Sequence, residues 1–375
     1  MTSAVLRTLG LGLVAWGSAA QRSDPRHNVW SHANIQRILA SNEAVQFENG
    51  PVGLTTFANI PYANCLSEEF DGNYDIAILG APFDTGVTGR PGARFGPRGI
   101  RAGSWRITPG EAWSVYTGRN VFQSWAKIVD CGDAHLTWLD NTVALAQLEK
   151  AHKVVGGRDA ASTTKSSKPR IITLGGDHTT TLPALRAAYQ RWGPMTVIHF
   201  DAHIDTWDPD VLGGESHYAG INHGTFLHIA HEEGLITNHS IHAGIRAPVS
   251  RPTEDMDNDK RCGFASITAR DLDILGTRGI IQALKDRVGD AKVYLSVDID
   301  VLDPAYAPAT GTAEPGGWTT RELLTILDAL AGLNIVGADI VEVAPVYDNA
   351  GETTVLVASE VVQSILDLMI QMPVE

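Results

Sequence analysis

The chain has 375 residues, of which 43% are hydrophobic and 19% are charged, and its formal net charge at pH 7 is −14. A chain of this length and composition can bury a sizeable globular core, either as one large domain or as two smaller ones. The negative charge argues against nucleic acid as a partner, and it is compatible with a cationic substrate or simply with solubility.

The N-terminus has the pattern of a secretory signal peptide. Arg7 precedes an apolar segment at 9–16, and small residues follow up to Ala20. The apolar segment is too short to span a bilayer, so we expect residues 1–20 to be cleaved and the chain to enter the secretory pathway. A mitochondrial leader or a cytoplasmic protein with an unstructured leader is the alternative. No later stretch resembles a transmembrane helix, so no membrane is expected as a partner.

Residues 21–70 show little periodicity and are expected to form an N-terminal extension. From residue 71 to 375, apolar strand-like runs alternate with segments of helical spacing. Strands are expected at 74–80, 127–131, 171–174, 195–200, 239–244, 292–297 and 335–342, and helices near 97, at 142–154, 181–191, 223–234, 277–288, 319–331 and 354–370. This alternation predicts a single α/β domain of three layers, with a mainly parallel central sheet and helices on both faces.

Two local features carry further expectations. Residues 156–169 are rich in Ser, Thr, Gly and Lys without an apolar period, which predicts a mobile surface insertion. The three cysteines permit at most one internal disulfide. Because Cys131 follows a strand that looks buried, we predict that Cys65 pairs with Cys262.

Six potential metal ligands stand at the ends of three predicted strands, where ligand sites of parallel sheets lie. Three of them follow one strand at every second position, so their side chains can project toward one place. The six are His178 after the strand at 171–174, Asp201, His203 and Asp205 after the strand at 195–200, and Asp298 and Asp300 after the strand at 292–297.

This ligand set contains two imidazoles, four carboxylates and no thiolate. Oxygen-rich sites with some imidazole suit Mn²⁺ better than structural zinc, and four carboxylates offset the charge of two divalent ions. We therefore expect two Mn²⁺ ions per subunit, with nickel and zinc as alternatives. Asp133 and His135 repeat the Asp-x-His pattern after another strand. Nothing else in the sequence converges on that pair, so we expect it to be structural.

Three motifs give the chain a resemblance to a known family. They are Leu174-Gly175-Gly176-Asp177-His178, Phe200-Asp201-Ala202-His203-Ile204-Asp205 and Ser296-Val297-Asp298-Ile299-Asp300. From about Asp75 to the C-terminus the chain resembles the ureohydrolases, the family of arginases and agmatinases. The segments 89–98 and 222–226 are similar to the agmatinase branch. The resemblance implies an arginase-like fold, a binuclear manganese centre and a homo-oligomer, either trimer or hexamer.

The resemblance also implies individual roles. One manganese would be held by His178, Asp201, Asp205 and Asp298, and the other by Asp201, His203, Asp298 and Asp300. A metal-bridging hydroxide would attack the guanidinium carbon of the substrate, with Asp205 steadying the tetrahedral intermediate. His223 would relay a proton to the leaving amine, with His217 and His228 as alternatives, and Glu342 would accept the substrate guanidinium bidentately.

The loop after Asp205 bears on the choice of substrate. Thr206-Trp207 stands where arginases have an Asn that helps hold the substrate α-carboxylate, and residues 207–218 include Asp208, Asp210 and Glu215 but no Lys or Arg. Such a loop suits a small substrate with a cationic tail, so we expect agmatine, cleaved to urea and the polyamine putrescine. Another guanidino compound such as 4-guanidinobutyrate, a silent guanidino-binding relative and a metal-dependent deacylase are the alternatives. Ala309 and Ala313 depart from the usual family pattern and affect the expected shape of the pocket.

Overall fold

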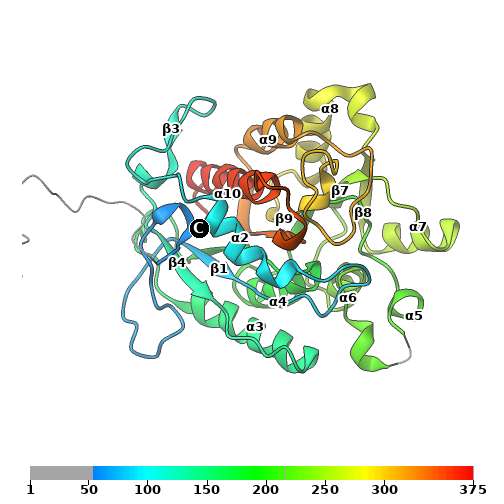
Figure 1. The fold of residues 1–375 in the computed structure, drawn as a ribbon, viewed down its shortest axis with the longest axis horizontal. Helices are drawn as coiled ribbons and strands as arrows, with labels where there is room; N and C mark the ends of the chain where they lie inside the picture. Colours follow the sequence, from blue (N-terminus) through cyan, green and yellow to red (C-terminus); the bar gives the residue numbers. More distant parts are fainter. Residues whose placement is uncertain (1–53, 215, 375) are drawn as a thin grey trace, which may run out of the picture. The chain divides into compact units, whose positions relative to one another are not determined.

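The computed structural model describes residues 54–214 and 216–374. The expected signal peptide and residues 21–53 of the expected extension lie outside these residues, and the proposed division of the chain stays a prediction. Within the described part, eight strands form one parallel sheet in the order β4-β1-β5-β10-β9-β6-β7-β8 (Figure 1). The strands are β1 Ile76–Gly80, β4 Ile128–Asp133, β5 Arg170–Leu174, β6 Thr196–Phe200, β7 Ser240–Ile245, β8 Phe264–Thr268, β9 Lys292–Asp298 and β10 Asn334–Val341.

Helices cover both faces of this sheet, as predicted (Figure 1). One face packs against α2 Gly96–Gly103, α8 Asp271–Val288, α9 Thr320–Ala329 and α10 Thr353–Gln371, and the other against α3 Asn141–Gly157, α4 Thr181–Trp192 and α6 Phe226–Glu232. Alternate strand residues explain the two layers: Ile76 and Ile78 join the core under α10, whereas Ala77 and Leu79 join the core under α3. Strands with both faces buried read as continuous apolar runs, which is why the sequence located them.

Two elements at the edge of the sheet were not predicted. In the edge strand β8 only Phe264 and Ile267 are buried, so it lacks the apolar run of the central strands. The helix α7, Pro252–Arg261, has almost no apolar residues to form a stripe. Proline at its start, acidic residues in its first turn and basic residues in its last turn favour a helix there. The remaining short elements are α5 Pro209–Leu212 and the hairpin of β2 Trp113–Ser114 and β3 Arg119–Asn120.

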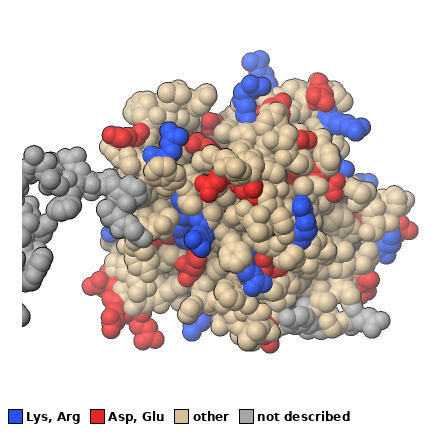
Figure 2. Space-filling model, viewed as in Figure 1, with Lys and Arg blue, Asp and Glu red and all other residues tan. Residues whose placement is uncertain are grey.

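The helix α10 is long and apolar enough to cross a membrane by composition alone. Within its most apolar window 72% of the helix is buried inside the fold, and it packs against α2, α9 and β10. It is therefore a core helix of this domain. Acidic and basic side chains are interspersed over the face of the molecule in Figure 2, so the charge surplus forms no single-sign patch on that face.

The segment 156–169 is anchored to the domain, which differs from the mobile insertion that its composition suggested. The Arg158 guanidinium donates to the backbone carbonyls of Cys65, Ser67 and Phe70. The N–H of Ser162 donates to Asp75, and the side chain of Ser166 is buried. Backbone groups of this segment thus find partners in the fold although no apolar period marks them.

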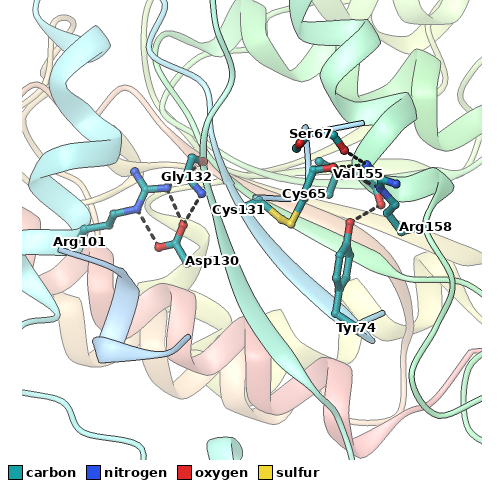
Figure 3. Close-up of a disulfide and its surroundings, with 9 residues drawn as sticks. All are labelled: Cys65, Ser67, Tyr74, Arg101, Asp130, Cys131, Gly132, Val155 and Arg158. Atoms are coloured by element: carbon teal, nitrogen blue, oxygen red, sulfur yellow. Dashed lines mark hydrogen bonds and ion pairs between the residues drawn. A yellow bond between two sulfur atoms is a disulfide. The ribbon is translucent and has the colours of Figure 1, made fainter. Parts of the chain in front are cut away.

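The disulfide joins Cys65 to Cys131, so the predicted pair of Cys65 with Cys262 is wrong. Cys131 lies on β4, and the segment carrying Cys65 runs beside that strand through a bridge between Tyr62 and Asp130. Figure 3 shows this disulfide, with Arg158 on one side of it and Arg101 on the other. The guanidinium of Arg101 pairs with Asp130. Cys262 is a free, buried thiol at the end of α7. The buried position of Cys131 on a strand did not prevent a disulfide, because Cys65 is buried in the same hydrophobic cluster.

We predict that the disulfide stabilises the fold by closing a long loop in the unfolded chain. The two cysteines are 66 residues apart, and a loop of this size corresponds to about 4 kcal/mol on the chain-entropy model, of which about 2–4 kcal/mol is typically measured. The double variant Cys65→Ala/Cys131→Ala should lose this much free energy of unfolding in a urea titration. Dithiothreitol should lower the midpoint of the wild type and leave that of the double variant unchanged. An unchanged wild-type midpoint would contradict this account.

Candidate metal centre

Four neighbouring strands, β5, β10, β9 and β6, bring the predicted site residues to one edge of the sheet. His178 follows β5, Glu342 follows β10, Asp298 ends β9 and Asp201 follows β6. Between β5 and His178 the backbone passes so close to its neighbour that a Cβ at Gly176 would lie 1.8 Å from the Phe83 carbonyl oxygen. Only glycine allows this approach.

The deeper part of the site gathers around His178. Its Nδ1 lies 3.1 Å from Asp201 Oδ2, 3.2 Å from Asp205 Oδ2 and 3.3 Å from Asp298 Oδ2. Two donors that each stand about 2.1 Å from an ion at right angles are about 3.0 Å apart. The observed separations fit ligands that share one ion, and they fit equally well the contacts of a protonated His178 with three carboxylates.

A second group lies beside the first. His203 Nδ1 is 3.3 Å from Asp201 Oδ1 and 3.1 Å from Asp300 Oδ2. Asp201 thus faces both groups, one oxygen to each, as expected for a bridging carboxylate. Asp298 Oδ1 accepts the backbone N–H of Asp300, just as Asp201 Oδ1 accepts that of His203. Each oxygen keeps a second lone pair, so the expected bridge by Asp298 stays a prediction.

The charges and hydrogen bonds of this cluster fit a metal centre. His178 Nδ1 and Asp201 Oδ2 are buried and have no hydrogen-bond partner among the described residues. Burial alone would lower the pKa of His178, but Asp201, Asp205 and Asp298 outweigh it and raise that pKa well above its usual range. Burial, with the neighbouring charges of Asp300 and Asp201, raises the pKa of Asp298 well above its usual range. The site therefore attracts positive charge, which a proton or a metal ion can supply.

His178 is held in the orientation that ligation requires. Its other ring nitrogen, Nε2, lies 2.7 Å from Ser296 Oγ, and Ser296 Oγ in turn donates to Asp339 Oδ1 at 2.6 Å. Ser296 must therefore accept from His178 Nε2, which leaves Nδ1 free for the cluster once an ion displaces any proton. Asp177 begins the turn that carries His178 by accepting the N–H of Thr179. Such outer contacts orient and tune metal ligands.

Two of the predicted catalytic residues have a left-handed backbone. Asp205 has φ 52° and Glu342 has φ 60°, in a region that non-glycine residues rarely adopt. This conformation costs about 1–3 kcal/mol each and persists only where surrounding contacts impose it. Both turns follow the end of a strand, and both aim a carboxylate at the same site. The strain is consistent with a functional role for both residues.

His223 and Glu342 lie in contact. His223 Nδ1 is 3.0 Å from Glu342 Oε1, which also accepts the N–H of His178 at 2.9 Å. Glu342 Oε2 is buried without a partner among the described residues. The expected bidentate contact with a guanidinium is therefore reduced to one free oxygen. His228, an alternative to His223, lies on α6 and contacts Asn258 instead. For His217 the side chain lies outside the described parts.

A cavity of about 130 Å³ opens onto the site. It is lined by Thr88, His203, Asp205, Trp207, Leu212, His223, Gly224, Ser250, Asp298 and Thr312, and none of these is Lys or Arg. Asp208 and Asp210, two of the acidic residues expected at its rim, are not among them, and Glu215 lies outside the described residues. Asp208 caps α5 by accepting the N–H of Asp210. Thr206 does not line the cavity either, and its hydroxyl donates to Asp259.

Other predicted residues have structural contacts. Asp133 of the second Asp-x-His pattern pairs with Arg101, in agreement with a structural role. Arg94, in the segment 89–98 that resembles the agmatinase branch, pairs with Asp84 and lies over the ring of Trp138, so it braces the loop after β1.

Sequence reasoning missed a buried histidine chain next to the cluster. His199 Nε2 lies 3.0 Å from Asp201 Oδ2, and His199 Nδ1 lies 2.8 Å from His242 Nδ1. His242 Nε2 in turn lies 2.8 Å from Asp259 Oδ1 on α7. Burial lowers the pKa of His199 to about 3, so this imidazole is neutral. The spacing of His199 and Asp201 at alternate strand positions was the one signal in the sequence that could have found it.

Comparisons with known proteins identify the family. The model of the arginase family matches residues 74–367. A Schizosaccharomyces pombe protein named "Putative agmatinase 1" is 47% identical over 97% of this chain and 96% of its own length. A guanidinobutyrase of Pseudomonas aeruginosa is 35% identical over 87% of this chain and 94% of its own length. The solved structure of proclavaminate amidinohydrolase from Streptomyces clavuligerus superposes with a TM-score of 0.75 at 33% identity, covering 85% of this chain and 98% of that one.

The chain therefore belongs to the arginase family. Within this family its similarity is to the agmatinase branch, and it is a hydrolase that acts on guanidino compounds. The expected fold is confirmed, since the solved relatives share the three-layer arrangement around a parallel sheet.

We predict that metal binding releases protons and strengthens as the pH rises. Without an ion, the pKa values of His178 and His203 are raised well above 6.5 against the effect of burial, by the carboxylates around them. Both imidazoles must lose a proton before they can bind an ion. Titration calorimetry of the metal-free protein with Mn²⁺ in two buffers of different ionisation enthalpy should show release of at least one proton per chain at pH 7. An affinity that is constant between pH 6 and 8 would contradict the prediction.

We predict that Ser296→Ala weakens metal binding without removing a ligand. The substitution leaves His178 Nε2 and Asp339 without their shared partner, so the ring loses its fixed orientation. The affinity for one of two Mn²⁺ ions should fall by about 10- to 100-fold. Thr325→Ala, which removes an exposed hydroxyl on α9, is the matched control and should leave the affinity unchanged. Equal affinities for both variants would show that the contact does not matter.

Proposed function

We propose that this protein hydrolyses agmatine to putrescine and urea with two Mn²⁺ ions. The observation that carries the proposal is the pair of ligand groups joined by Asp201, next to a cavity whose lining has no Lys or Arg. His178, Asp201, Asp205 and Asp298 would hold one ion, and Asp201, His203, Asp298 and Asp300 the other. When bound, the two ions lower the pKa of water, supply a nucleophile at neutral pH and stabilise developing negative charge.

The chain's own residues orient the guanidinium. Glu342 is buried, and its free Oε2 can accept a guanidinium N–H in a charge-assisted hydrogen bond. Its other oxygen is fixed by His178 N–H and His223 Nδ1, so the carboxylate cannot rotate away. Asp205 lines the cavity on the side of the deeper ligand group and can accept a second guanidinium N–H. Fixed acceptors of this kind favour a planar cation with several donors.

His223 is suited to protonate the leaving amine. Burial lowers its pKa, but Glu342, Asp205 and Asp177 outweigh burial and raise the pKa to about 9. The raised pKa favours uptake of a proton by this imidazole. The Nδ1 proton is held by Glu342, whereas Nε2 accepts the backbone N–H of Thr88 at 3.0 Å at the cavity wall. Nε2 would carry a proton and hand it to the amine nitrogen once this contact with Thr88 opens.

The cavity lining favours a substrate tail without a carboxylate. Trp207 and Leu212 provide apolar surface for methylene groups, while Thr88, Ser250 and Thr312 provide hydroxyls. A substrate carboxylate would lose hydration beside Asp205 and Asp298 with no Lys or Arg side chain in the lining to compensate. An amine meets no such repulsion. Agmatine fits this lining better than arginine or 4-guanidinobutyrate does.

The test is urea release by the Mn²⁺-loaded protein from agmatine, arginine, 4-guanidinobutyrate and guanidine. We predict that kcat/KM for agmatine exceeds that for the others by at least tenfold, and that Asp201→Ala removes all activity while retaining the far-ultraviolet circular dichroism of the fold. Comparable turnover of 4-guanidinobutyrate would overturn the substrate assignment. Absence of urea from every compound would favour a silent guanidino-binding relative, and release of acetate from acetylated amines would favour a deacylase.

We also propose that the chain enters the secretory pathway. The disulfide between Cys65 and Cys131 supports this, because structural disulfides form and persist mainly in oxidising compartments. Expression of the full chain with a C-terminal tag should yield a secreted product that begins near residue 21. Retention of Met1 in a cytosolic product would contradict the proposal.

A further inference from the structure

The turn before β7 carries the triplet Asn238-His239-Ser240, which the proposed hydrolysis does not use. Asn-x-Ser or Asn-x-Thr, where x is not proline, is the acceptor of N-linked glycans in secreted proteins. No other asparagine in the 375 residues begins such a triplet. A triplet of this kind also arises by chance, so its place in the fold decides whether a glycan fits there.

Asn238 lies on the surface and its side chain holds no part of the fold together. The residue is exposed, and among the described residues its side-chain amide forms no hydrogen bond. Only its backbone carbonyl is engaged, as the acceptor of an N–H from Arg287 Nη2 at 2.9 Å. The side-chain nitrogen Nδ2 can therefore take a covalent substituent without breaking a contact of the domain.

The turn that carries Asn238 is fixed by its neighbours. The Arg287 guanidinium donates to the carbonyls of Asn238, Ser240 and Gly263, which ties the turn to the start of β8. A Cβ at Gly263 would lie 2.4 Å from the Asn238 Cα, so glycine is what allows this approach. Ser240 is buried, and its Oγ accepts the N–H of Val197 at 3.0 Å. The backbone around the acceptor thus keeps its shape whatever Asn238 carries.

The turn lies at the end of the sheet opposite the candidate metal centre. The metal ligands follow the carboxyl ends of their strands, whereas Asn238 precedes the amino end of β7 in the same parallel sheet. β7 has six residues, which separate its two ends by roughly 20 Å at about 3.3 Å per residue. A bulky substituent on Asn238 therefore leaves the cavity at the metal centre open.

We propose that Asn238 carries an N-linked glycan in the mature protein. The inference rests on the proposed entry of the chain into the secretory pathway, where the donor, a lipid-linked oligosaccharide, is found. Asn238 Nδ2 forms a bond to C1 of the donor sugar and gives up one proton, and the bond from C1 to the lipid pyrophosphate breaks. Because the Ser240 hydroxyl of the acceptor is buried in the folded chain, this transfer precedes the folding of β7.

A glycan at this position also affects which surfaces can meet another chain. The edge strand β8 begins beside the turn, with Phe264 opposite Ser240 in the register. Edge strands can pair with a second chain unless something covers or disrupts them. A large hydrophilic group on Asn238 opposes such pairing and keeps the amino ends of β7 and β8 outside any interface between copies of this chain.

The test is peptide mass spectrometry of the full chain purified from the medium of a eukaryotic secretory host. We expect the peptide containing Asn238 to carry a hexosamine-based glycan, and peptide-N-glycosidase to remove it and leave Asp at this position. Asn238→Gln should abolish the modification and increase the mobility of the protein in a denaturing gel. Asn73→Gln is the matched control, since Asn73 is exposed but begins no acceptor triplet, and it should keep the glycan.

The outcomes separate this inference from the proposals on which it rests. A secreted chain with unmodified Asn238 would overturn this inference alone. A cytosolic chain that retains Met1 and carries no glycan would overturn the secretory proposal and this inference with it. The glycan is measured without reference to catalysis, so a glycosylated chain that releases no urea would support this inference while the proposed hydrolysis fails.

Discussion

Concentrated negative charge at the carboxyl ends of four neighbouring strands is the constraint on which the site depends. Asp201, Asp205, Asp298 and Asp300 are buried close together, and within the described residues no Lys or Arg side chain forms an ion pair with any of them. Burying such charge without compensation is costly, so this part of the fold needs a cation to be stable in its ionised form. Under the proposed function, metal binding and folding are linked, and the same ions that compensate the charge provide the chemistry.

The parallel sheet makes this concentration of charge possible. All its strands end at the same edge, and the apolar cores under α10 and α3 fix their register. Strained turns at Asp205 and Glu342 then aim carboxylates that regular strands would direct elsewhere. The stability of two packed layers thus supports a site that is strained and electrostatically unfavourable when no ion is bound.

The sequence predicted the parts that depend on local pattern. Apolar runs located the central strands, and alternate spacing located Asp201, His203 and Asp205 at a strand end. The parts it missed depend on which strands become neighbours. His199 and His242 are 43 residues apart and meet only because β6 pairs with β7. The partner of Cys65 was missed for the same reason, since the segment before β1 runs beside β4. The acidic loop residues were assigned to the pocket from composition, but Asp208 caps α5 instead.

The central claim is that this cluster is a binuclear metal centre. The most direct test is the stoichiometry of Mn²⁺ binding to the metal-free full chain, measured by elemental analysis after equilibrium dialysis. The account predicts two ions per chain, with both ligand groups weakened in Asp201→Ala because Asp201 faces both. Binding of no ion, or of a single ion that Asp201→Ala leaves unchanged, would contradict it.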